Sequence, residues 1–299
     1  MDFLYAASLH SFFNNEDSNS TFRCRPHSIR RICIFILYMK LQLAHATSPS
    51  DLTILRRGGC NTGYAGCGLP HSHERSQNWP NTALFFLEND LKSGHKMNVL
   101  FTKSSNQASF LPHDVVKSIP FSSTKMTEIL NNFAVKPGSI KAEVIKNTIK
   151  VCEESAIKGE DKYCATSLES MLDFITSKLG KDVEAFSTKV MMKKETKKQE
   201  YTITNRVKMV GQTKVVVCHK LNYLYAVFYC HKIEKTVAYT VLLEGADGSR
   251  VKAVSVCHRD TSAWSPKHLA FQMLKVKPGS VPICHFLFQD SITWVPKQN

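Results

Sequence analysis

The stretch Val215–His231, VVVCHKLNYLYAVFYCH, holds two Cys-His doublets within sequence that favours β-strands. Two more doublets follow, in AVSVCHRD and VPICHFLF, after gaps of 10, 25 and 25 residues. The four doublets are Cys218-His219, Cys230-His231, Cys257-His258 and Cys284-His285. Chance does not place four such pairs so close together, so they are the feature that the fold and the function must explain.

Successive side chains of a β-strand point to opposite faces of the sheet. A doublet on a strand therefore cannot easily direct both side chains to one metal ion. We expect the four cysteines on one face, where they can form two disulfides in any of three pairings, and the four histidines on the other. Imidazoles gathered at one place suggest a metal site, for which the candidate ligands are His219, His231, His258 and His285. Neutral imidazole suits copper, zinc, nickel or iron, and an all-nitrogen ligand set fits Cu(II) well.

Two other interpretations of the doublets stay open. One is a zinc site that mixes thiolates and imidazoles, although such ligands are normally two to five residues apart rather than adjacent. The other is a set of disulfides beside histidines that only satisfy hydrogen bonds. The remaining histidines, such as His95, His113 and His268, stand alone and are expected at the surface or in hydrogen bonds.

The composition is that of a globular protein with an unusual charge. The chain has 299 residues, 43% of them hydrophobic and 21% charged, with a formal net charge of +14. Such a charge suggests a polyanionic partner: nucleic acid, an anionic membrane or an acidic polysaccharide. The basic residues are scattered, and the dense run MMKKETKKQE has no aromatic residues for base stacking, which argues against nucleic acid.

The first 46 residues contain a segment typical of a secretory signal. Arg30 and Arg31 precede an apolar run, Ile32–Met39, and the small residues Ala44 and Ala46 follow. The run is too short to span a bilayer, so we expect no stable membrane span. Cleavage after Ala46 would remove Cys24 and Cys33 of the ten cysteines and leave eight, in a compartment where disulfides persist. The alternative is a buried amphipathic segment of the fold.

Residues 47–81 are rich in Ser, Gly, Pro, Asn and His without apolar periodicity, which predicts a linker or disordered segment. Cys60 and Cys67 lie there and are candidates for a local disulfide. Tyr64 and Trp79 are the two aromatic residues of this linker.

A folded domain is expected over residues 82–296. Its helical part, about residues 120–180, is predicted as helix, loop, helix: a helix at STKMTEILNNFAV, a second capped by Ser139, and a third that begins at Thr166 with Glu169 as a capping box and ends at Gly180. Cys152 and Cys164 lie at the ends of the last two, where a disulfide would contribute about 3 kcal/mol.

The β part, about residues 185–296, consists of short runs rich in Val, Tyr and Phe that predict strands. These runs are TKVVVCH, YAVFYCH, TVAYTVLL, RVKAVSVCH and HLAFQMLKV. Asp247-Gly248 marks a turn between two of them. The fold class is therefore α+β, with a helical hairpin region followed by a mostly antiparallel β region that carries the doublets.

Several sequence segments, together with the doublets, carry a family resemblance. They are ALFFLENDLKSGHKMN, EDKYCATSLESMLDFITSKLGK, WSPKHLAFQMLKVKPGSVPICHF and the closing Trp294. Over about Thr82–Trp294 the chain resembles the BURP-domain family of plant secreted and cell-wall proteins, and DKYCATSLESMLDF is most similar to its dehydration-responsive subgroup. The resemblance implies a place in the apoplast or cell wall, a role in drought, salt and abscisic-acid responses, and pectin as the acidic partner.

The resemblance also implies candidate activities. Some family members are copper-dependent peptide cyclases that crosslink a Tyr or Trp of their own N-terminal segment, with the doublet histidines on copper and the doublet cysteines paired. Carried over, His219, His231, His258 and His285 would bind copper, and Tyr64 or Trp79 would be the crosslink acceptor. Another branch contains noncatalytic subunits associated with polygalacturonase. Whether this chain is an enzyme is left open.

Overall fold

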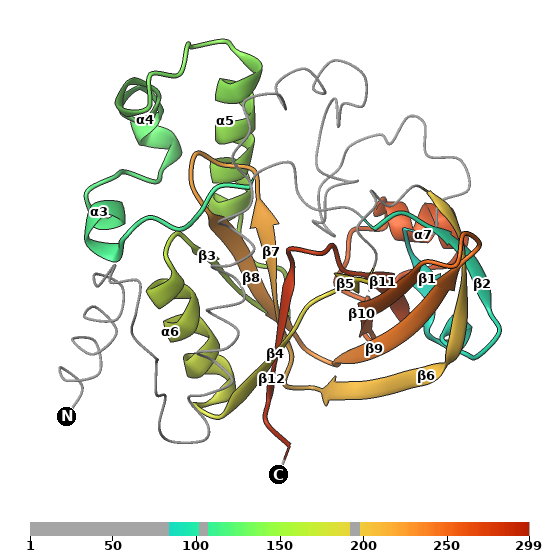
Figure 1. Ribbon diagram of the computed structural model, residues 1–299. Coiled ribbons are helices and arrows are strands. Elements are labelled where there is room, and N and C mark those ends of the chain that lie inside the picture. Colours follow the sequence, from blue (N-terminus) through green and yellow to red (C-terminus); the bar gives the residue numbers. More distant parts are fainter. Residues whose placement is uncertain (1–83, 102–106, 192–197, 299) are drawn as a thin grey trace, which may run out of the picture. The chain divides into compact units, whose positions relative to one another are not determined.

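The computed structural model describes residues 84–101, 107–191 and 198–298, all of which belong to one compact unit of the chain, His45–Asn299. The described residues form helices and two antiparallel sheets, so the predicted α+β class is confirmed. Figure 1 shows the helices α3–α6 in green, ahead of most of the strands along the chain. The predicted leader (1–46) and linker (47–81) lie outside the described residues.

The larger sheet, here called sheet A, has the strand order β1-β11-β10-β9-β6-β2, with β5 paired to β10. Its central strands are long, and β6 shifts register against β9 at two β-bulges or irregularities. The strands of sheet A are β1 (Phe86–Leu87), β2 (Lys96–Val99), β5 (Lys189–Val190), β6 (Gln199–Gln212), β9 (Thr236–Gly245), β10 (Arg250–His258) and β11 (Ile283–Phe286).

The smaller sheet, sheet B, has the order β3-β8-β7-β12-β4. Neighbouring strands within it pair antiparallel. The strands of sheet B are β3 (Glu160–Ala165), β4 (Val183–Phe186), β7 (Val216–Leu221), β8 (Val227–Ile233) and β12 (Ile292–Pro296).

The helices pack mainly on sheet B. α5 contributes Ile145 and Ile149 to the same buried cluster as Tyr229 of β8, whereas α6 stacks Phe174 on Tyr163 of β3. Tyr163 is opposite Cys230 in the register and Cys164 is opposite Tyr229, so the two helices cover opposite faces of the sheet. The helices are η3 (Glu88–Asp90), α3 (His113–Lys117), η4 (Ser123–Lys125), α4 (Met126–Asn132), α5 (Ile140–Glu153), α6 (Leu168–Leu179) and α7 (Leu269–Leu274).

The helix termini agree only in part with the sequence prediction. Ser139 caps α5 by accepting a hydrogen bond from the Ala142 amide, and α6 ends at Gly180, whose φ of 89° suits glycine. The capping box of α6 is formed by Ser167 and Ser170, not by Thr166 and Glu169 as predicted. The prediction was wrong by one residue because Ser167 has the extended backbone that a cap requires.

Strands also occur where the sequence did not predict them. β1 and β2 precede α3, and β3 lies between α5 and α6 where a loop was expected. β3 begins with three charged residues and alternates half-buried with exposed positions, so its apolar signal is weak. The β structure therefore begins well before residue 185.

The run HLAFQMLKV was predicted as a strand and is instead the helix α7. His268 caps it through Nδ1, which accepts from the Ala270 amide at 3.1 Å. Leu269, Phe271 and Met273 alternate with smaller or polar residues and so imitate a strand, but Phe271 is buried and Met273 is 37% exposed. A run this short fits both the two-residue period of a strand and the 3.6-residue period of a helix, and the His268 cap favours the helix.

Candidate functional site

The four doublets lie on four strands, one on each of β7, β8, β10 and β11. In β7 and β8, Cys218 is directly opposite Cys230, so both side chains point to the same face of sheet B. In β10 and β11, Cys257 is likewise opposite Cys284 on sheet A. Each histidine follows its cysteine by one residue and therefore points to the other face.

Three disulfides join six of the described cysteines. Cys218 pairs with Cys230 and Cys257 with Cys284, with Cα atoms 3.9 and 4.0 Å apart, so each bond crosses between directly opposed residues of neighbouring strands. Of the three pairings that the doublet sequences allow, the structure has this one. Cys152 pairs with Cys164, which joins the end of α5 to β3. Cys60 and Cys67 lie outside the described residues.

The four histidines come together between the two sheets. The Nε2 atoms of His219 and His231 are 3.3 Å apart. The His219 and His285 ring centroids are 6.3 Å apart, and those of His285 and His258 are 5.7 Å apart. The rings thus form a continuous series from β8 through β7 and β11 to β10. We call this set, His219, His231, His258 and His285, the histidine cluster.

The packing of the sheets explains why these rings meet. Val217 of β7 shares a buried cluster with Val254 and Val256 of β10. Val217 lies two residues from His219 and Val256 two residues from His258, so each valine shares a face with its histidine. The faces that pack sheet on sheet are therefore the faces that carry the histidines, while Cys257 and Cys284 lie in a separate core with Tyr201.

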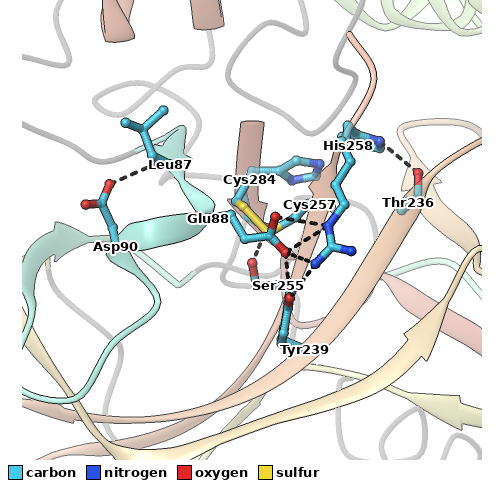
Figure 2. The surroundings of a disulfide bond; sticks show 11 residues. Leu87, Glu88, Asp90, Thr236, Tyr239, Ser255, Cys257, His258 and Cys284 are labelled. Carbon is cyan, nitrogen blue, oxygen red and sulfur yellow. Dashed lines mark hydrogen bonds and ion pairs between the residues drawn. A yellow bond between two sulfur atoms is a disulfide. The ribbon is translucent and has the colours of Figure 1, made fainter. Parts of the chain in front are cut away.

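Burial shields three of the four cluster histidines from water, whereas His285 is half-buried. His219 and His231 are each 3% exposed, and His258 is 1% exposed. His258 Nδ1 lies 3.1 Å from Thr236 Oγ1 and His285 Nδ1 lies 3.4 Å from the Phe286 carbonyl. Figure 2 shows His258 directed toward Thr236, beside the Cys257–Cys284 disulfide.

The Glu160 carboxylate reaches the cluster. Glu160 Oε1 lies 2.9 Å from His231 Nδ1, and both side chains are 2% exposed. Tyr229 Oη donates to the same oxygen at 2.8 Å. Burial, and next the charge of Glu160, raise the pKa of Tyr229, so its hydroxyl keeps its proton. Glu160 was not predicted from the sequence. The signal for it is the alternation of Glu160, Lys162 and Cys164 in β3, which places all three side chains on one face of the sheet.

Aromatic rings enclose the cluster on the other side. Trp264 contacts His258 at 5.2 Å between ring centroids, and Phe85 contacts His285 at 6.2 Å. Both also contact His268, at 4.7 and 5.5 Å. His268, which the sequence left as an isolated histidine, is therefore hydrogen-bonded as a helix cap and is also part of the wall of the cluster.

The spacing of the ring nitrogens fits metal ligation for one pair. Two nitrogens that bind one metal ion at about 2.0 Å lie roughly 2.8 to 3.3 Å apart, depending on the coordination geometry. The His219–His231 distance of 3.3 Å lies within that span and is also that of a hydrogen bond between a protonated and an unprotonated nitrogen. Within the described ranges no three His, Cys, Asp or Glu side chains are arranged to hold a metal ion. A copper site of four histidines stays a prediction.

The disulfides leave the doublet cysteines without thiolates, which contradicts a mixed Cys/His zinc site.

Comparison with known proteins identifies the family. The family model of the BURP domain matches residues 84–296, which include every strand and helix given above. The chain belongs to the BURP domain family. The resemblance seen in the sequence is thereby confirmed.

Three similar proteins show how much of the chain is shared. BURP domain protein RD22 of Arabidopsis thaliana is 53% identical over 220 residues, which cover 72% of this chain and 56% of that protein. BURP domain-containing protein 3 of Oryza sativa subsp. japonica is 50% identical over 72% of this chain and 51% of its own length. BURP domain-containing protein BNM2C of Brassica napus is 37% identical over 73% and 81%. The chain spans about half the length of the first two, and its similarity to RD22 is consistent with the dehydration-responsive subgroup.

Proposed function

We propose that this BURP-domain protein is secreted to the cell wall or apoplast, takes part in abiotic-stress responses, and binds copper through its histidine cluster. The observation that carries the proposal is the sorting of the doublets. Their cysteines are paired on the sheet faces opposite to those that carry the histidines, and their histidines converge between the sheets.

Secretion is supported by the disulfides and by the leader. Cys152–Cys164, Cys218–Cys230 and Cys257–Cys284 are bonds that persist in oxidising compartments. The segment Arg30–Ala46 has the order of a secretory signal. In the part of the chain that the structure describes, no helix is long and apolar enough to cross a membrane. A fluorescent fusion of the full chain, viewed in plasmolysed cells, tests the location: signal in the wall space supports the proposal, and signal confined to the cytosol contradicts it.

Copper binding is supported by the chemistry of the donors. The four side chains are imidazoles, they come from both sheets, and neutral imidazole is a good ligand for Cu(II). Closing all four onto one ion would require the His258 and His285 rings to move toward the His219–His231 pair. Copper, when bound, would supply one-electron oxidation with molecular oxygen as the electron acceptor.

Purified protein with its disulfides intact provides the test of copper binding. We expect about one Cu(II) per chain by elemental analysis after gel filtration. A variant with all four cluster histidines changed to Ala should fold and bind none. His95→Ala and His113→Ala together form the matched control, because both are histidines outside the cluster. Equal copper in wild type and the fourfold variant would contradict the proposal.

The convergence of the four imidazoles also favours a second candidate, a copper-dependent cyclase acting on its own N-terminal segment. Tyr64 and Trp79, the candidate acceptors, lie outside the described residues. Joining either ring to a nearby carbon or nitrogen would remove two hydrogens, which oxygen accepts as hydrogen peroxide. Mass spectrometry of the reduced and alkylated peptides Gly58–Arg75 and Ser76–Lys92, with and without Cu(II) in air, tests this. A copper-dependent loss of two hydrogens at Tyr64 or Trp79 makes the protein an enzyme, and unmodified peptides leave it a binding protein.

A third candidate, a noncatalytic subunit associated with acidic polysaccharide such as pectin, is supported by the charge of +14. It needs no catalytic residue and is compatible with copper binding.

A further inference from the structure

Glu160 contacts the histidine cluster through a hydrogen bond to His231, and its environment is unusual. Its side chain is 2% exposed, although an ionised carboxylate is costly to bury without partners. Oε1 lies 2.8 Å from Tyr229 Oη and 2.9 Å from His231 Nδ1, and Oε2 accepts from the Ile157 amide at 3.2 Å. These contacts fix the carboxylate in one place.

The backbone around Glu160 is fixed as well. The Glu160 amide donates back to the Ile157 carbonyl at 3.1 Å, which closes a tight turn at the start of β3. Gly159 in that turn has a φ of 82°, and its carbonyl accepts from the Glu234 amide at 3.0 Å. The Cys152–Cys164 disulfide ties the same strand to α5. The carboxylate is therefore held from the turn, the strand and the neighbouring helix.

We infer that Glu160 is a positioning residue, which holds His231 as the Nδ1–H tautomer and so turns the Nε2 lone pair of His231 into the histidine cluster. A carboxylate only accepts hydrogen bonds, so at 2.9 Å the proton lies on His231 Nδ1. A neutral imidazole with Nδ1–H has its lone pair on Nε2, the atom 3.3 Å from His219 Nε2. Carboxylates in this position orient metal-binding histidines and raise their basicity. The inference rests on the proposed copper site for its function, but not for its geometry.

A second carboxylate in the same protein provides a matched control. Glu88 also accepts from a tyrosine hydroxyl, that of Tyr239, but its other partner is Arg259 rather than a histidine. Glu88→Gln and Glu160→Gln therefore make the same chemical change beside a tyrosine, and only the second lies against the cluster.

The first readout uses metal-free protein. Nitrogen chemical shifts of the histidine rings at about pH 8 report which nitrogen carries the proton, and the His231 signal is assigned by its absence from His231→Asn. We expect the Nδ1–H tautomer at His231 in wild type and in Glu88→Gln. Glu160→Gln should show a mixture, because an amide both donates and accepts. A His231 that keeps the Nδ1–H tautomer in Glu160→Gln overturns the inference.

The second readout is Cu(II) affinity by competition with a chelator. We expect Glu160→Gln to bind about 10- to 100-fold more weakly and Glu88→Gln to bind like wild type. Unchanged affinity in Glu160→Gln overturns the positioning role toward metal. If wild type itself binds no Cu(II), the copper proposal fails, and the tautomer measurement still decides the role of Glu160.

Glu160→Asp covers the case in which Glu160→Gln does not fold. It keeps the negative charge, but the side chain is one methylene shorter, so the carboxylate lies farther from His231 Nδ1. The same loss of tautomer preference is expected, and an aspartate that preserves the tautomer would show that charge, not position, is what His231 requires.

Discussion

Glu88 adds side-chain contacts between the short β1–η3 segment and sheet A to the backbone pairing of β1 with β11. Its carboxylate accepts hydrogen bonds from Arg259 Nη2 at 2.7 Å and from Tyr239 Oη at 2.5 Å. Figure 2 shows Glu88 and Tyr239 beside the Cys257–Cys284 disulfide. Partial burial opposes the ionisation of Glu88, but the hydrogen bonds from Arg259 and Tyr239 outweigh it, and the pKa of Glu88 lies below its usual value. The contacts therefore favour the carboxylate form.

This lowered pKa gives a pH dependence with a definite sign. The unfolded chain binds a proton at Glu88 near its ordinary pKa of about 4.3, whereas the folded protein binds it only at lower pH. The stabilisation is thus present above about pH 4.3 and is lost as the pH falls through the folded pKa. We predict that Arg259→Met lowers the free energy of unfolding at pH 7 by about 1 kcal/mol, a small value because Arg259 is 36% exposed and screened by solvent.

Urea unfolding at about pH 7 and about pH 3 measures this effect. The difference between Arg259→Met and wild type should shrink at the lower pH, where Glu88 begins to be protonated. Arg250→Met is the control, because its guanidinium lies 3.7 Å from Glu244 and is 64% exposed, and it should change nothing. A difference that persists at about pH 3 would mean that Arg259 contributes by packing rather than by charge.

At the scale of the element, α7 depends on its cap. His268 Nδ1 accepts from the Ala270 amide at 3.1 Å, at the start of a helix of only 6 residues. We predict that His268→Ala lowers the free energy of unfolding by about 1 kcal/mol and that His268→Asn restores most of it, because an Asn side chain also caps a helix. Thermal unfolding measures both. Equal losses would assign His268 to its packing against Trp264 and Phe271 instead.

The disulfides allow a comparison between elements, because two of them close loops of equal length. Cys152–Cys164 and Cys218–Cys230 both have a sequence separation of 12, and Cys257–Cys284 has 27. If unfolded-chain entropy dominates, replacing either of the first two pairs with Ala lowers the free energy of unfolding by the same amount, about 3 kcal/mol, and the third by about 3.5 kcal/mol. Chemical unfolding of the three double variants measures this. A much larger loss for Cys218–Cys230 would show that this bond also holds the register of β7 and β8.

The same elements show what a sequence can predict. The face argument for the doublets needs only the two-residue period of a strand, so the separation of Cys218 from His219 was predictable. The choice among three cysteine pairings was not, because it depends on which strands are neighbours: Cys218 meets Cys230 only through the β7–β8 register. Glu160 was missed for a similar reason, since its contact with His231 joins residues 71 apart in the chain.

At the scale of the whole molecule, both the amount of positive charge and its position on the surface bear on function. Removing residues 1–46, with five basic and three acidic residues, changes the formal charge from +14 to +12. Lys189 of β5 is directly opposite Lys252 of β10, and both are exposed. We propose that this pair of lysines forms part of the surface that binds a polyanion.

A column of polygalacturonate tests the polysaccharide proposal with residues 47–299. We predict retention at low salt and release as ionic strength rises, because charges at a surface are screened within about 10 Å at 0.1 M salt. Lys189→Glu with Lys252→Glu should elute at clearly lower salt than Lys267→Glu with Lys277→Glu, although both double variants change the net charge equally and all four lysines are exposed. Equal elution of the two would reduce the interaction to net charge without a defined surface. No retention of the unmodified protein would remove acidic polysaccharide as the partner and leave the histidine cluster as the basis of its function.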